Sequence, residues 1–364
     1  MCGVLLCSSP LTAQFDTKKL LEDFSLQLFE ANAKGFMSPL VIVANVGAND
    51  GFYNSAHVAK ENKFHFNFSI RTMSAWVRDD QRTYTGHLPL EPDPRDKNGP
   101  QIFPGITQME VFKLYMKAAV TSGELKTDIT SATVFGDKGE YFKIPKNSLR
   151  SIPGISDSLL RTLPDSIRLT NGTNQTFVFA AVPQLKIGTF MSTEMLLRFI
   201  PPVKFDTAVG EFSFFGIAMK HGFTNWIKNS PVDAAIQISY QYSTIENQVG
   251  ETRAKLEATT KMWSINLHVS RRFGYVEPYI GFSFENLHSN GSYTFTLPKT
   301  VVDQIGYDID PQVAKISLDD NAYKFTIGCT GHVGPVEAYV SAGFSKQFIL
   351  GAGLGVNFGL PWGK

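Results

Sequence analysis

The stretch that decides the fold is Phe348 to Phe358, which reads FILGAGLGVNF. Its glycines at 351, 353 and 355 could belong to a loop that cradles a phosphate. The dinucleotide-binding fingerprint would need its third glycine at position 356, where this chain has Val356. With a period of two, large apolar side chains share one face, and the glycines and Asn357 share the other. We therefore interpret the segment as a strand whose inner face is nearly bare.

The same alternation recurs along the chain from residue 64 onward. It is clearest in FHFNFSI (64–70), AAIQISYQYS (234–243), WSINLHVS (263–270), VEPYIGFSFE (276–285), YKFTIGC (323–329) and VEAYVSAGFS (336–345). Two architectures produce such strands: a soluble sandwich with a shared core, and a closed barrel whose apolar faces meet lipid.

Strand length and aromatic placement favour the barrel. The strands run to about ten residues or more, which is the length of a tilted membrane-crossing strand. Aromatic residues stand near strand ends, as in an interfacial girdle; they are Trp76, Trp226, Trp263, Tyr242, Tyr323 and Phe358. We predict an all-β protein, a closed antiparallel transmembrane β-barrel of about 12 to 14 strands with a short N-terminal helical plug. FILGAGLGVNF would close it, with the plug or a ligand against its glycines.

Composition argues against several other classes of protein. The formal net charge is +1 and charged residues make up 18% of the chain, without a basic run, so we expect no nucleic-acid partner. No apolar run approaches the roughly 20 residues of a membrane-spanning helix. Cys2 and Cys7 lie in the first residues, which leaves Cys329 without a disulfide partner. The histidines lack zinc-site spacing and no nucleophile elbow occurs, so we predict no enzyme, no catalytic residue, no metal and no cofactor.

The N-terminal region is predicted to hold two segments. Residues 1–14 are interpreted as the remnant of a secretory signal peptide, with lipidation at Cys7 as a lesser alternative. Residues 15–60 are predicted to form a plug, and 61–364 the barrel. An amphipathic helix over 16–30, capped by Asp16, would start the plug. Its apolar face would carry Leu21, Phe24, Leu28 and Phe29.

Charged residues occur within predicted strands, and long polar stretches separate others. Arg198, Lys220 and His221 are predicted to form a lumen polar anchor near Glu194, because charge on the lipid face is costly. They would either form a salt-bridge network that stiffens the barrel, or hold the plug or line a substrate path. Residues 79–104, 143–174 and 297–320 are predicted extracellular loops, with a helical element at 107–120.

Two stretches resemble known barrel families. GFYNSAHVAKENKFHFNFSI (51–70) resembles the hatch segment of FadL-type long-chain fatty acid transporters, with Asn54-Ser55-Ala56 where those have Asn-Pro-Ala. VPQLKIGTFMSTEMLLRFIPP (182–202) and GIAMKHGFTNWI (216–227) look more like a Bacteroidetes outer-membrane barrel family related to that superfamily. The matching residues are Gln184, Gly188, Arg198, Phe199, Pro201, Lys220, His221 and Trp226. The resemblance implies a plugged barrel, and FadL-type relatives imply passive uptake of hydrophobic molecules.

These observations lead to a first functional hypothesis and two alternatives. The first is passive transport of a fatty-acid-like small molecule through a plugged barrel in the outer membrane of a Gram-negative bacterium, with Asn54 at the hatch. The second is a structural or assembly barrel that docks other outer-membrane proteins through its long loops. The third is a soluble secreted sandwich. Outer-membrane lipid is the expected surrounding in the first two.

Overall fold

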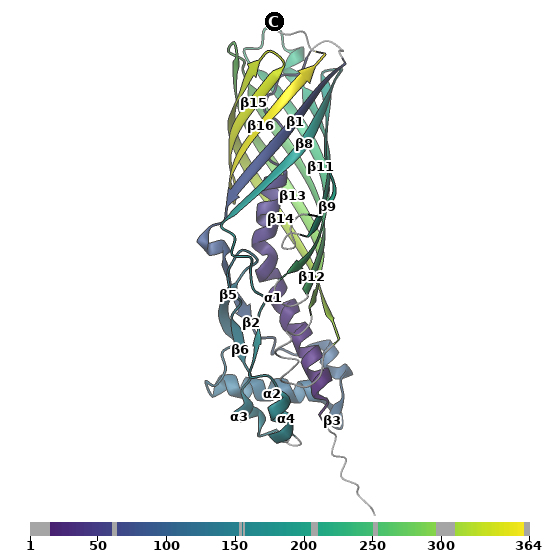
Figure 1. The fold of residues 1–364 in the computed structure, drawn as a ribbon, viewed down its shortest axis with the longest axis vertical. Helices are drawn as coiled ribbons and strands as arrows, with labels where there is room; N and C mark the ends of the chain where they lie inside the picture. Colours follow the sequence, from purple (N-terminus) through teal and green to yellow (C-terminus); the bar gives the residue numbers. More distant parts are fainter. Residues whose placement is uncertain are drawn as a thin grey trace, which may run out of the picture.

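A computed structural model describes residues 15–59, 64–152, 155, 157–204, 210–249, 254–295 and 310–359. The predicted signal segment and Cys7 lie outside the described residues. Within them the predicted closed antiparallel β-barrel is confirmed (Figure 1). Its strands are β1 (His65–Trp76), β8 (Phe177–Phe190), β9 (Thr193–Lys204), β10 (Glu211–Gly222), β11 (Asp233–Val249), β12 (Ala254–Ser270), β13 (Val276–Phe295), β14 (Gln312–Val333), β15 (Val336–Phe344) and β16 (Phe348–Phe358).

The barrel closes with ten strands in the described chain, so the predicted 12 to 14 was wrong. Each strand pairs with its neighbour in sequence, except that β1 pairs with both β8 and β16. Pairing of the first strand with the last closes the sheet. Several polar segments that could have added strands instead fold outside the barrel, between β1 and β8.

The outer face of the barrel carries a band of exposed apolar side chains. On β14 the outward side chains change from exposed Lys315 and Asp319 to Tyr323, Phe325 and Ile327. The strands therefore continue past the apolar band, and part of the predicted loop 297–320 is strand, since β14 begins at Gln312. All six predicted girdle aromatics are exposed, from 37% for Tyr242 to 74% for Trp226. Neighbouring rings touch at the band edge, with Trp263 and Phe284 centroids 5.3 Å apart.

Residues 77–176 form a separate unit at one end of the barrel, which we call the insert (Figure 1). Its strands pair only in two-stranded sheets: β2 (Thr83–His87) with β5 (Asp128–Ala132), β3 (Gln101–Phe103) with β4 (Ile106–Thr107), and β6 (Tyr141–Lys143) with β7 (Ser166–Arg168). Its helices are η1 (Asp79–Gln81), η2 (Pro94–Asn98), α2 (Gln108–Thr121), α3 (Lys146–Leu149) and α4 (Asp157–Thr162). The helix predicted at 107–120 is thus confirmed as α2, capped by Thr107 and Glu110.

The two barrel ends differ in their connections. At the end that carries residue 359, β8 and β9 are joined by Met191–Ser192, and residues 271–275 and 334–335 make two more short turns. We call this the turn end. Residues 223–232, with η3 (Phe223–Trp226), also lie there. The opposite end carries the insert and the short turn 345–347 between β15 and β16, and β9, β11 and β13 end there.

Helix α1 (Thr17–Ala48) runs from the insert into the barrel (Figure 1). Asp16 caps it by accepting a hydrogen bond from the Lys19 amide at 3.0 Å. Its 32 residues extend 18 positions past the predicted end at residue 30. At about 1.5 Å per residue the helix is roughly 48 Å long, enough to join the two regions. None of the described helices is both long and apolar enough to cross a membrane.

Candidate functional site: the lumen and its polar chamber

The barrel lumen is filled by the last turns of α1 and by residues 49–58, which together we call the plug segment. The segment runs from the insert end toward the turn end, where the chain enters β1. Phe52, Tyr53 and Asn54 are all at most 6% exposed. Tyr53 stacks on His268 of the barrel wall at a centroid distance of 4.2 Å. The plug segment is therefore in close contact with the wall.

Arg198 fixes the plug segment to β9. Its guanidinium donates to the carbonyls of Ala48 and Asp50 at 2.9 and 2.8 Å, and to the Gln184 side chain at 2.8 Å. The same group lies over the Phe52 ring, 3.6 Å from its centroid. Arg198 faces inward because it shares strand parity with buried Glu194 and Leu196. One side chain thus binds the backbone just beyond α1, where a helix leaves unpaired carbonyls.

Two lysines bind the plug segment from other strands. Lys324 of β14 donates to the Val46 carbonyl at 3.2 Å and pairs with Glu285 at 2.7 Å. Lys220 of β10 donates to the carbonyls of Ser55 and His57 at 3.3 and 3.2 Å. Its charge is paired with Glu194 at 2.7 Å. Each buried ammonium therefore has both a carboxylate partner and a plug carbonyl, which satisfies its donors.

Amide side chains complete these contacts. Asn45 donates to Asp320 at 2.8 Å, and Gln241 donates to Asn49 at the same distance. Asn54 donates to Glu337 at 3.2 Å. The wall residues come from β11, β14 and β15, so the plug segment is bonded around much of its circumference.

The glycine face of β16 lies against this segment at Gly351, as the sequence predicted, whereas at Gly353 and Gly355 it meets residues of the wall. A Cβ on Gly351 would contact the Asp50 carboxylate, and one on Gly353 would overlap the Tyr339 ring. The Arg71 guanidinium lies over the Tyr339 ring, with its carbon 4.5 Å from the ring centroid. The bare face therefore makes room for a plug carboxylate and for aromatic side chains of the wall.

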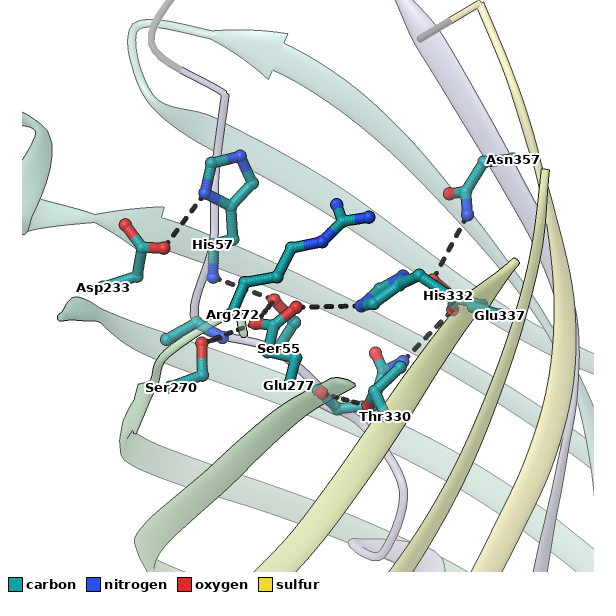
Figure 2. Close-up of polar contacts among 12 residues, drawn as sticks. Ser55, His57, Asp233, Ser270, Arg272, Glu277, Thr330, His332, Glu337 and Asn357 are labelled. Atoms are coloured by element: carbon teal, nitrogen blue, oxygen red, sulfur yellow. Dashed lines mark hydrogen bonds and ion pairs between the residues drawn. The ribbon is translucent and has the colours of Figure 1, made fainter. Parts of the chain in front are cut away.

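A polar chamber of about 420 Å³ lies at the turn end, beyond the plug segment (Figure 2). Its walls include the ends of β8, β13 and β15, the turn 271–272, and Ser55 and His57. Glu277 accepts hydrogen bonds from Ser270 at 2.6 Å and from Ser55, and lies 2.9 Å from His332 Nε2. His57 Nδ1 lies 3.1 Å from the Asp233 carboxylate. His65 Nε2 lies 3.3 Å from Glu194, so the chamber is lined by three histidine and carboxylate pairs.

The predicted site residues are not gathered in one place. Arg198 and Lys220 face the lumen and donate hydrogen bonds to the plug segment. Asn54 belongs to that segment and donates to Glu337 of the wall. Leu21, Phe24 and Leu28 are buried against the insert, outside the lumen, in a cluster with Phe112. Phe29 packs against Tyr293 at 6.1 Å. The helix continues past residue 30, so its first half never reaches the lumen, and the predicted apolar plug face was misplaced.

His221 was wrongly assigned to the lumen. It follows inward-facing Lys220 directly, so strand alternation turns it to the outer face. There its ring lies 2.9 Å from the Thr193 hydroxyl and 4.9 Å from the Trp226 ring. Sequence reasoning also missed Lys324, Glu285 and Arg71. Their positions on the polar face of alternating strands were the available signal. No group of three or more His, Cys, Asp or Glu residues in the described chain could hold a metal ion.

The fold and the bonded lumen define a plugged barrel of the outer-membrane type. The chain belongs to a family whose description reads "Family of unknown function (DUF6588)", which matches residues 1–358. No curated protein matches the sequence.

Three solved structures show a distant likeness. The outer membrane protease OmpT from Escherichia coli is 11% identical, with a TM-score of 0.32 over 83% of this chain and 98% of that one. The outer membrane channel DcaP of Acinetobacter baumannii is 8% identical, with a TM-score of 0.18 over 82% and 96%. Pseudomonas putida OprB is 10% identical, with a TM-score of 0.16 over 82% and 94%.

Proposed function

We propose that this chain is a sealed outer-membrane barrel that holds its insert at the outer surface of a Gram-negative cell, where the insert docks partner proteins. One observation carries the proposal: Arg198, Lys220 and Lys324, from three different strands, bind the plug carbonyls. Such a lumen is built to keep the plug in place. The proposal includes no catalytic step, cofactor or metal.

The connections support the orientation. Outer-membrane barrels place short turns toward the periplasm and longer loops toward the outside. The insert end would accordingly face the medium, and the turn end with its polar chamber would face the periplasm. The insert has its own apolar core, including Phe112, Met116 and Leu149, so it would present a folded surface.

Conductance across a planar bilayer tests the seal. The full chain should conduct few ions, whereas Arg198→Ala should open frequent channels because two plug carbonyls lose their donor. Lys315→Ala, on the outer face of β14, is the matched control and should stay closed. Open channels of equal size in the unaltered chain would contradict the seal.

Docking at the insert needs a separate measurement. Crosslinking on intact cells, followed by pull-down of the detergent-extracted full chain, should recover another outer-membrane protein through residues of the insert. A control with crosslinkers placed on outward residues of the turn end should not. Recovery of the lone barrel with lipid, at every crosslinker position, would contradict docking while leaving the seal intact.

Passage of a hydrophobic small molecule, the FadL-type function, is a second candidate. A small apolar pocket between α1 and the barrel mouth favours it, lined by Phe29, Phe36, Met37, Tyr84 and Tyr293 among others. The described strands pair continuously around the barrel, so the molecule would need to displace the plug. Uptake of a fluorescent fatty acid into proteoliposomes tests this. Phe36→Asp should abolish uptake, and equal uptake by empty liposomes would rule it out.

A further inference from the structure

We propose that the polar chamber at the turn end is a binding site for a soluble oxyanion, a phosphate ester or a carboxylate. The inference goes beyond the proposed function, because neither the seal nor docking at the insert requires a ligand there. It rests on three cations that line the chamber and form no ion pair within 4 Å with a carboxylate of the described residues: Lys186, Arg271 and Arg272. The charges of Glu194 and Glu337 act on Lys186 only at longer range.

Each of the four carboxylates that line the chamber has another partner within 4 Å. Glu194 pairs with Lys220 at 2.7 Å, and Glu337 pairs with Arg71 at 3.1 Å. Glu277 lies against His332, and Asp233 against His57. Within 4 Å, none of these four carboxylates in the described chain reaches the three cations.

The cations lie on two sides of the space. Lys186 has the same strand parity as buried Gln184, so its side chain points into the barrel from β8. Arg272 extends over the chamber between His57 and His332 (Figure 2). Its Nε donates to the Gly274 carbonyl at 3.0 Å, which orients the guanidinium and leaves its two terminal nitrogens for a ligand. Arg271 lies over the Phe273 ring at 5.1 Å.

These donors suit an oxyanion. A guanidinium offers parallel N–H donors that match two oxygens of a phosphate or carboxylate, and an ammonium adds a point charge. The chamber's volume of about 420 Å³ falls within the range of small-molecule sites. A lipid head group is the other possible source of an oxyanion. The Lys186 side chain points into the lumen, away from the lipid, and therefore favours a soluble oxyanion over a lipid head group.

Phosphate binding provides the test. The full chain would be placed in phosphatidylcholine nanodiscs and titrated with inorganic phosphate and with acetate, observed by calorimetry. Lys186→Gln and Arg272→Gln should each weaken phosphate binding about tenfold or more, as expected when a charge-assisted hydrogen bond is lost. Lys315→Gln on the outer face of β14 is the matched control and should bind within about twofold of the unaltered chain.

Two further measurements make the result decisive. Heat-modifiable gel migration checks that each variant barrel is folded; Arg272 lies in an exposed turn, so its variant is the safer of the two. The titration is repeated in discs that contain phosphatidylglycerol. No phosphate binding by the unaltered chain, binding unaffected by Lys186→Gln, or an effect confined to phosphatidylglycerol discs would each overturn the proposal. Bilayer conductance is independent of these outcomes, so the seal can fail or hold separately.

Discussion

The two halves of α1 are held by different forces. Near its start, Leu20, Phe24 and Leu28 are at most 3% exposed in the core of the insert, and the Phe24 and Phe112 rings meet edge to face at 5.1 Å. Toward its end, Lys324 and Arg198 bind the helix carbonyls. Apolar burial is non-directional, whereas charged hydrogen bonds require a particular geometry. The second half is thus fixed in register by charged hydrogen bonds. The first half is held mainly by apolar burial, to which Gln27 adds a hydrogen bond to Asp96 at 2.7 Å.

The largest expected effect comes from removing one charge in the lumen. Lys324→Met leaves Glu285, whose side chain is 0% exposed, and Asp50 without their cation. Breaking a buried ion pair by one partner costs about 3–5 kcal/mol. We expect a clearly lower urea midpoint for loss of the heat-modifiable form, together with channel openings.

The control for this variant is Lys315→Met, on the same strand but with its side chain outward and exposed. Its free energy of unfolding should stay within about 0.5 kcal/mol of that of the unaltered chain. A Lys324→Met protein as stable as the control would show that Glu285 finds another partner, and the contrast between the two halves would fail.

A smaller effect is expected in the first half of α1. Phe24→Ala removes a ring that is 1% exposed, at a cost of about 3 kcal/mol, near the lower end for buried phenylalanine because the insert can relax around the space. Hydrogen exchange should rise across the insert while heat-modifiable migration of the barrel is kept. Leu114→Ala, on an α2 residue that is 64% exposed, should change neither. Equal loss of both regions would mean that α1 unfolds as one unit.

The sequence predicted the barrel because alternation is a local property, and the outward and inward faces of β16 are as expected. The number of barrel strands depended on whether the segment between Trp76 and Phe177 would join the barrel wall. Tertiary packing decides that, since β2 and β5 pair with each other and not with the wall. The length of α1 was also missed, because Gly35 and Pro39 suggest a helix end and only the surrounding barrel and insert override them.

The candidate site was less predictable than the fold. Alternation alone places Lys324 and Glu285 on inward faces, and it would also have excluded His221. Which cation meets which carboxylate depends on the register of β13 against β14, where Ser283 pairs with Lys324 and Glu285 with Ala322. Register between strands is a non-local property that one sequence does not reveal. For the same reason, the chamber joins residues that are far apart in the chain.

A third variant tests how closely the side chains around the second half of α1 are packed in the lumen. In Gly353→Leu the new side chain would meet the Tyr339 ring and displace it from Arg71. Overpacking of this kind costs about 1–3 kcal/mol. The urea midpoint should fall, whereas Ala352→Leu, with its side chain outward and exposed, should leave it nearly unchanged. A tolerated leucine at 353 would indicate a loosely filled lumen, and the contrast with the insert would weaken.

The smallest effect is expected at a partly exposed group of charges between the insert and the first half of α1. Arg95 in the insert donates to Asp93 at 2.7 and 2.9 Å and to Glu30 of α1 at 2.7 Å. These hydrogen bonds from Arg95 lower the pKa of the Asp93 carboxyl to about 2. A carboxyl with a depressed pKa contributes stability above its ordinary value near 4, and loses it as the pH falls toward 2. Both partners are partly exposed, so the contribution should stay below about 1 kcal/mol.

Arg95→Gln should bring the pKa of Asp93 back toward its ordinary range, as measured by carbon NMR of the labelled carboxyl. Thermal unfolding of the insert should then depend less on pH between about 4 and 2, with a small loss at neutral pH. Arg150→Gln removes another exposed insert pair, with Asp157, and should leave the Asp93 titration unchanged. If Arg95→Gln instead destabilised the insert as much as Phe24→Ala, charge would matter in the first half of α1 as it does in the lumen. The two halves of α1 would then differ in location but not in the kind of interaction that holds them.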